Sequence, residues 1–162
     1  MTHSTTPTPG AAGRVVLIAN QTIGGEHLQE AVVSRIDAGR TAFHLLVPVA
    51  NYLSRAIASP AAVESGIPMV ATDQVDYERQ LGEQRLQAGL GWLDGLGAAA
   101  TGEVILMVDA VERVRGLVDA GDVVEVVVST LPSRLSKWLH QDLPHRVERK
   151  VDVPVAVVTP AD

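Results

Sequence analysis

Polar and basic side chains gather in one stretch of the chain, residues 129–150, directly after an apolar run that is typical of a buried strand. In open α/β sheets, ligands bind beside the carboxyl ends of the strands, so this stretch stands where a site is expected. Its arginine and lysine side chains suit an anion, because such groups donate charge-assisted hydrogen bonds to oxyanions. The candidate ligand-binding residues are Asn20, Ser129, Thr130, Ser133, Arg134, Ser136, Lys137 and Asp142.

The same stretch has a plainer interpretation, as a loop followed by a solvated helix face. Trp138 would then cover the core, and the basic residues near position 150 would interact favourably with the helix dipole. Asp142 would serve as an N-cap, with Pro144 in the first turn of the helix. The sequence leaves both interpretations open.

Catalytic and metal sites find little support in the residue pattern. Ser129 and Thr130 would need an adjacent general base to act as nucleophiles, and no Gly-x-Ser-x-Gly elbow surrounds them. We expect them to satisfy backbone groups at the strand end. His140 and His145 are five residues apart, which is not the i,i+4 spacing of a helical metal pair. The chain has no cysteine, so thiol chemistry is excluded, and we expect no catalytic residue and no metal.

Length and charge narrow the class of protein. The 162 residues fit one domain, in which residues 1–13 are predicted as a disordered tail and residues 14–162 as the folded part. The formal net charge of −6 gives no overall attraction to nucleic acid or to an anionic membrane. The sequence has neither a long apolar span nor a secretory signal pattern, so we expect a cytoplasmic protein.

Strand and helix patterns alternate along the domain. Continuous β-branched runs predict strands covered on both faces, and apolar stripes at three-to-four spacing predict helices packed on them. The predicted strands cover residues 14–20, 41–47, 103–108, 123–129 and 154–159, with Pro48 ending the second. The predicted helices cover residues 28–36, 74–98 and 111–120 and a segment ending near 150, and residues 49–73 form a long connection. This order predicts an α/β fold with an open five-stranded parallel sheet and helices on both faces.

Two segments carry a specific resemblance to a known family. Residues 126–130 read Val-Val-Val-Ser-Thr, and residues 146–158 read Arg-Val-Glu-Arg-Lys-Val-Asp-Val-Pro-Val-Ala-Val-Val. They are similar to the fourth strand and to the closing helix and strand of the universal stress protein family, and the element order resembles that family over nearly all of residues 14–158. The resemblance implies a Rossmann-like sheet of the adenine nucleotide alpha hydrolase type, with strand order 3-2-1-4-5, and a homodimer formed through the last strand.

The nucleotide-binding members of that family carry two glycines three apart after the fourth strand, then nine residues, then Gly followed by Ser or Thr. In this chain the glycine positions fall on Leu131, Arg134 and Gln141, and the hydroxyl position falls on Asp142. Large side chains obstruct the backbone amides that would hold phosphate, and Asp142 adds a negative charge there. The family's adenine-contacting Asp falls on Asn20, which is uncharged. We therefore expect no cofactor, with ATP or AMP disfavoured.

Three functions stay open at this point. The resemblance favours a non-catalytic stress-response binding or signalling module that pairs with a second copy through the apolar edge at residues 154–158. The second is a small-ligand sensor that holds an anion or a nucleotide beside the fourth strand. The third is a nucleotide-processing enzyme, which would need a phosphate loop or paired acids that the sequence lacks.

Overall fold

The computed structural model describes residues 13–50, 68–131 and 143–160, with side chains described from residue 76 onward in the second range. Five parallel strands form an open sheet in the order β3-β2-β1-β4-β5. The predicted fold class and strand order are therefore confirmed. Residues 1–12 of the predicted tail and residues 51–67 of the predicted connection lie outside the described residues. The strands are β1 (Arg14–Ile18), β2 (Ala42–Val49), β3 (Ala99–Leu106), β4 (Val123–Ser129) and β5 (Val155–Val158).

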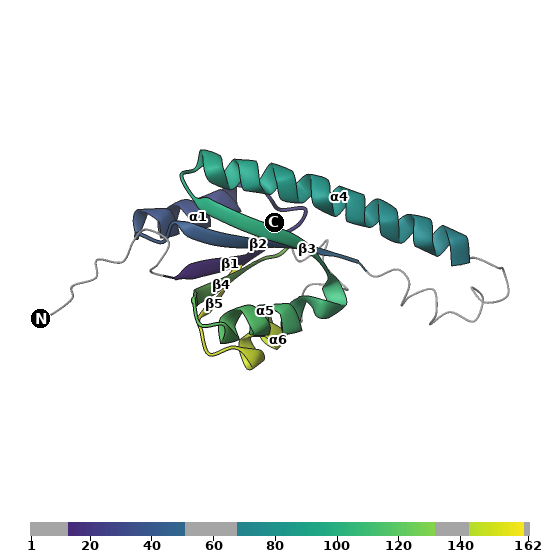
Figure 1. The fold of residues 1–162 in the computed structure, drawn as a ribbon. Helices are drawn as coiled ribbons and strands as arrows, with labels where there is room; N and C mark the ends of the chain where they lie inside the picture. The colour runs from purple at the N-terminus through teal and green to yellow at the C-terminus, as the bar shows by residue number, and fades with distance from the viewer. Residues whose placement is uncertain (1–12, 51–67, 132–142, 161–162) are drawn as a thin grey trace, which may run out of the picture.

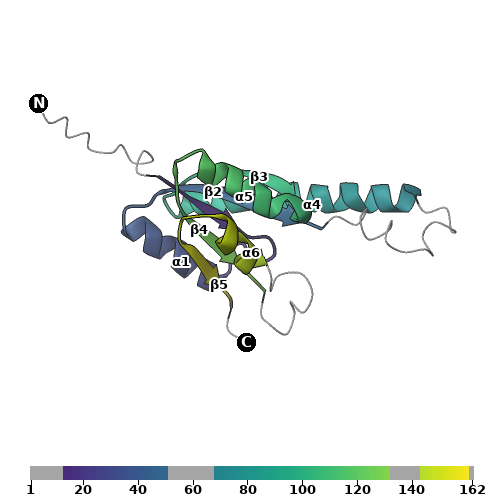
Figure 2. The same ribbon diagram turned by 90° about the horizontal axis from the view of Figure 1, so that it is seen from below.

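Helices cover both faces of the sheet, as Figure 1 shows. The helices α1 (Glu26–Asp37) and α4 (Pro68–Gly95) lie on one face, and α5 (Ala110–Asp119) and α6 (Leu143–Lys150) lie on the other. A short 3-10 helix, η1 (Met107–Asp109), joins β3 to α5. In both Figure 1 and Figure 2 the start of α4 extends beyond the end of the sheet.

Each face of the sheet carries its own apolar core, because neighbouring residues of a strand point to opposite faces. Val15 and Leu17 of β1 pack under α1 and α4, whereas Val16 and Ile18 pack under α5 and α6. All four side chains are at most 1% exposed. This double burial explains why the strand is apolar throughout and does not alternate with polar residues.

Two elements begin several residues before their predicted starts. The long helix begins at Pro68 and not near residue 74, because the fixed φ of proline and its missing N–H suit the first turn of a helix. β3 begins at Ala99 and not at residue 103. The segment Ala-Ala-Thr-Gly has low strand propensity, but it pairs with β2 from its first residue, and tertiary pairing overrides propensity in strands.

Pro48 lies inside β2 and does not end the strand as predicted. β1 ends its pairing level with Leu46. The carbonyl oxygens of Leu46 and Pro48 both point to the β1 side, where they accept hydrogen bonds from the Ala19 backbone and the Asn20 side chain. Since the N–H and C=O of a residue in a parallel strand point the same way, the N–H that Pro48 lacks would face the space beyond the end of β1. No ladder bond is lost there.

Glycines let α4 and β3 approach β2 closely. A Cβ atom on Gly82 would lie 2.7 Å from Val49 Cγ1, and one on Gly89 would lie 2.6 Å from Leu45 Cδ2. On β3, a Cβ atom on Gly102 would lie 2.7 Å from the carbonyl oxygen of Leu45. These distances are shorter than van der Waals contact in a close-packed interior, so the spacing between the helix and the sheet depends on the missing side chains.

A buried polar network lies between β2, β3 and α5. His44 is 8% exposed, and its Nδ1 is hydrogen-bonded to Thr101 Oγ1 at 2.7 Å. Its Nε2 lies 3.4 Å from Glu103 Oε1, which accepts a hydrogen bond from Arg113 Nε. Burial lowers the pKa of His44 below its ordinary value of 6.5 and outweighs the nearby carboxylate. Burial raises the pKa of Glu103, but its bonds with Arg113 and His44 outweigh this, so the net pKa lies below its ordinary 4.5.

The substitutions Gly82→Ala and Gly91→Ala test the close approach on one helix. Both should gain about 1 kcal/mol of helix propensity. At Gly82 the added methyl group meets the stiff side chains of Val49 and Val104, whereas nothing lies within 4 Å of a Cβ on Gly91. We expect Gly91→Ala to be more stable than Gly82→Ala by about 1–3 kcal/mol in chemical denaturation. Equal free energies of unfolding would contradict this packing.

His44 should make the protein less stable as the pH falls. Its folded pKa lies below its unfolded pKa, so the unfolded state binds more protons, and the free energy of unfolding decreases as the pH drops below 6.5 toward the folded pKa. One group changes this free energy by at most about 1.4 kcal/mol per pH unit. In urea denaturation at about pH 7 and about pH 5, His44→Gln should lose less stability than the wild type. His145→Gln, at an exposed residue of α6, is the control and should keep the wild-type difference; a His44→Gln loss as large as that of the wild type would rule out this role.

Candidate functional site

The carboxyl ends of β1 and β4 lie side by side at the centre of the sheet, where the strand order reverses direction. β1 pairs with β2 on one side and with β4 on the other, so the connections that follow β1 and β4 leave in opposite directions. Such switch points open a crevice in which α/β proteins bind ligands. Asn20 follows β1 and Ser129 ends β4, so two of the candidate residues flank this crevice.

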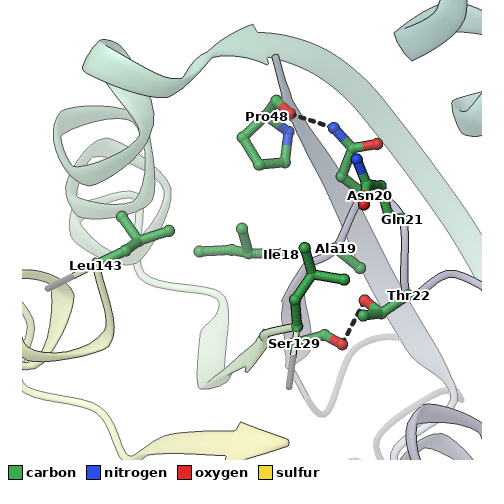
Figure 3. A pocket seen from close by; sticks show the side chains of 9 residues that line it. Ile18, Ala19, Asn20, Gln21, Thr22, Pro48, Ser129 and Leu143 are labelled. Carbon is green, nitrogen blue, oxygen red and sulfur yellow. Dashed lines mark hydrogen bonds between the residues drawn. The ribbon is translucent and has the colours of Figure 1, made fainter. Parts of the chain in front are cut away.

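The side-chain amide of Asn20 is hydrogen-bonded at both ends. Its Nδ2 donates to the Pro48 carbonyl oxygen at 2.6 Å, as Figure 3 shows. Its Oδ1 accepts from Arg85 Nη1, also at 2.6 Å. Asn20 therefore ties together the ends of β1 and β2 and the long helix α4, and a ligand would meet an amide that is already engaged.

Arg85 is a site residue that the sequence analysis did not identify. It lies on α4 and is half-buried. Leu81 and Gly89 lie four residues before and after it, so all three share one face of the helix, and Gly89 packs on the sheet. A basic residue on the sheet-facing stripe of a predicted helix was the available signal, because such a residue must reach a polar group at the sheet edge.

The hydroxyl groups at the strand ends pair with one another. Thr22 Oγ1 and Ser129 Oγ are 2.6 Å apart and link the loop after β1 to the end of β4. Thr130 Oγ1 and Thr159 Oγ1 are 2.7 Å apart and link the ends of β4 and β5. We expected Ser129 and Thr130 to satisfy backbone groups; among the described residues, the partner of each side chain is another hydroxyl group.

Two cavities open at this edge of the sheet. The smaller one, at the switch point, has a volume of about 50 Å³, which holds roughly one to a few water molecules. Leu143 at the start of α6 and Ile18 close one side of it, and Asn20 and Ser129 stand across from them (Figure 3). The lining residues are Ile18, Ala19, Asn20, Gln21, Thr22, Pro48, Ser129, Leu131 and Leu143.

The larger cavity, of about 460 Å³, lies between the start of α1 and the ends of β4 and β5. Its volume falls within the range of roughly 300–1,000 Å³ that is usual for small-molecule sites. The loop and first turn at residues 21–28 form one wall, and Ser129, Leu131, Val158 and Pro160 form the other. Leu131 and Ser129 line both cavities and so stand between them.

The other candidate residues lie outside the described residues, so the structure places neither them nor the remaining positions of the glycine signature. The three candidates that the structure describes, Asn20, Ser129 and Thr130, do stand at neighbouring strand ends. The undescribed candidates are Ser133, Arg134, Ser136, Lys137 and Asp142.

The most buried charge among the described residues lies at the opposite edge of the sheet. Glu125 of β4 is 8% exposed and accepts hydrogen bonds from Arg35 at 2.6 and 3.0 Å and from Arg40 at 2.9 Å. A buried carboxylate needs such partners, so the ion pairs of Glu125 have a structural role and require no ligand. Across the described ranges, no group of three or more His, Cys, Asp or Glu side chains is placed to hold a metal ion. None of the helices described is both long and apolar enough to cross a membrane.

No protein-family model matches the sequence, and no curated protein matches it either. Solved structures do match. The hypothetical protein MJ0577, a test case of structural genomics for the structure-based assignment of biochemical function, gives a TM-score of 0.60 at 12% identity over 93% of this chain and 98% of that one. The universal stress protein from Archaeoglobus fulgidus gives a TM-score of 0.55 at 14% identity over 90% of this chain and 97% of that one. The chain therefore has the fold of a universal stress protein, as its order of elements predicted.

Proposed function

We propose that the protein is a non-catalytic binding module of the universal-stress-protein type, acting in stress response or signalling, which does not bind ATP as the family's nucleotide-binding members do. The observation that carries this proposal is the cavity of about 50 Å³ at the switch point, with Leu131 in its wall. By the resemblance, Leu131 stands where those members carry a glycine. A leucine side chain keeps phosphate oxygens away from backbone amides that glycine would leave open.

The bonds of Asn20 support the same proposal. By the resemblance, the nucleotide-binding members carry an aspartate at this position. An aspartate would place a carboxylate oxygen against the Pro48 carbonyl oxygen, to which Asn20 Nδ2 now donates at 2.6 Å. A nucleotide that used Asn20 would meet an amide with one donor and one acceptor site already engaged, by Pro48 and by Arg85, and the bond to the charged Arg85 is worth about 1.5–3 kcal/mol.

The hydroxyl pairs argue against nucleophilic catalysis. A serine or threonine nucleophile needs a histidine, lysine or carboxylate to take its proton. Ser129 instead pairs with Thr22, and Thr130 pairs with Thr159. We accordingly propose no catalytic activity and no cofactor for this protein.

A small-ligand sensor is the second candidate function, and the larger cavity favours it. Its volume of about 460 Å³ suits a small molecule, and the hydroxyl groups of Thr22 and Ser129 are among its polar groups. Ile23, Leu28 and Val158 add apolar surface. A few polar groups in a mainly apolar wall are typical of ligand pockets.

We further propose a cytoplasmic location and no nucleic-acid or membrane partner. The net charge of −6 repels the phosphates of nucleic acids and anionic lipids. Binding to either would require a local basic surface large enough to overcome this repulsion.

The edge strand β5 supports a homodimer as part of the proposal. It pairs with β4 on one side, and no strand among the described residues pairs with its other side. Val157 in this strand is 53% exposed. An apolar edge strand with free backbone groups is a template for pairing with another chain, and a second copy would cover it.

Titration calorimetry with MgATP and with AMP tests the nucleotide proposal. We expect no measurable heat up to roughly millimolar nucleotide, because the cavity at the switch point has a volume of only about 50 Å³ and Leu131 lies in its wall. The same protein, checked for folding by circular dichroism, should show no ATP hydrolysis above buffer. Micromolar binding of ATP that Leu131→Trp abolishes would place a nucleotide in the crevice and refute the proposal.

Multi-angle light scattering tests the dimer. The wild type should run as a dimer at micromolar concentration, and Val157→Glu should run as a monomer, because the charged side chain would be buried without a partner. Val108→Glu is the matched control: Val108 is 60% exposed but lies on η1, and the variant should stay dimeric. A monomeric wild type, or a dimer unchanged by Val157→Glu, would count against pairing through β5.

A further inference from the structure

Arg85 differs in its partner from the arginines of the fold that form short ion pairs. Arg35, Arg40 and Arg113 each lie within 3.0 Å of a carboxylate oxygen. Half-buried Arg85 instead bonds the neutral amide of Asn20, and it forms no ion pair with a described carboxylate. Charged groups that lose part of their water are usually paired with an opposite charge. Arg85 departs from this rule, because no described carboxylate neutralises its positive charge.

The charge of Arg85 lies at the carboxyl ends of the strands, where open α/β sheets bind ligands. Asn20 lines the cavity at the switch point, and Arg85 on α4, which is not itself a lining residue, donates to the Asn20 side chain. The start of α4 extends past this end of the sheet (Figure 1). A positive charge held there, partly shielded from water, attracts an anion more strongly than a fully solvated arginine does.

Two nitrogens of the Arg85 guanidinium are not engaged by described residues. Nη1 donates to Asn20, while Nε and Nη2 make no hydrogen bond to a described residue. These two nitrogens carry the parallel N–H groups that bind two oxygens of a carboxylate or phosphate at once. An oxyanion can therefore bind to Nε and Nη2 while Nη1 keeps its bond to Asn20. That bond holds the fork formed by these two N–H groups in place.

We propose that Arg85, held by Asn20, is the recognition element for a small oxyanion, a carboxylate or phosphate group, at the strand-end site. This rests on the proposed function as a binding module and adds the class of ligand. The bound group is an oxyanion and not the base of a nucleotide, because Arg85 supplies charge and a planar fork where the cavity beside Asn20 has too little volume for a ring system.

The test compares thermal unfolding of the wild type, Arg85→Gln and Arg79→Gln in sodium phosphate, sodium acetate and sodium chloride at equal ionic strength. In the wild type, phosphate, acetate or both should raise the unfolding midpoint above the chloride value, because a ligand that binds only the folded state stabilises it. Arg79→Gln removes an exposed arginine of the same helix and should show the same rise. Arg85→Gln should require about 10- to 100-fold more of the anion for the same rise, the loss expected for one charge-assisted contact.

Each variant is compared with itself in chloride, so a lower starting stability of Arg85→Gln does not affect the result. Should Arg85→Gln fail to fold, Arg85→Lys keeps the charge without the fork and should bind the anion more weakly than the wild type. No rise for either anion in the wild type, or an equal rise in Arg85→Gln, would overturn the inference. That outcome would leave the proposed binding module standing, whereas micromolar binding of MgATP would refute the proposed function whatever the anions do.

Discussion

The close approach of α4 to β2 and β3 is the constraint on which the rest of the site depends. It is possible because Gly82, Gly89 and Gly102 present no side chain at the contact. Because the helix lies this near the sheet, Arg85 reaches the end of β1 and donates to Asn20 at 2.6 Å. A helix held further out by alanine side chains would carry its guanidinium away from the strand ends. The glycines thus affect the site by setting the spacing between α4 and the sheet, which lets Arg85 reach Asn20.

Asn20 and its two neighbours satisfy one another's hydrogen-bond donors and acceptors. Pro48 has no N–H to offer beyond the end of β1, but its carbonyl oxygen still needs a donor, and the Asn20 amide supplies it. The other end of the same amide needs a donor in turn, and Arg85 supplies that. Aspartate at this position would satisfy Arg85 and leave the Pro48 carbonyl oxygen facing a carboxylate. The uncharged residue after the end of β1 and the proline in β2 are therefore parts of one local arrangement.

Sequence reasoning predicted what depends on local pattern and missed what depends on tertiary distance. The five strands follow from their apolar runs, and their order was implied by the resemblance to the universal stress protein family; the structure has both. The early start of β3 was missed because Ala99 and Gly102 become strand only through pairing with β2. Arg85 was missed because its role needs a partner 65 residues away along the chain. Of the candidate site, the described residues Asn20, Ser129 and Thr130 were placed correctly at neighbouring strand ends, but their hydrogen-bond partners could not be read from spacing.

Different kinds of hydrogen bond are found at the two ends of the strands, which we call the amino edge and the carboxyl edge of the sheet. At the amino edge the bonds join full charges, with Glu125 held by Arg35 and Arg40. At the carboxyl edge the bonds described join neutral groups, hydroxyl to hydroxyl and amide to carbonyl, and Arg85 brings a charge without a carboxylate. The carboxylate of Glu125 already has its cationic partners, whereas an arginine without a carboxylate beside neutral hydrogen-bonding groups can still form charge-assisted hydrogen bonds to an anion. The distribution of charge thus supports the proposed oxyanion site at the carboxyl edge, whereas the ion pairs at the amino edge belong to the fold.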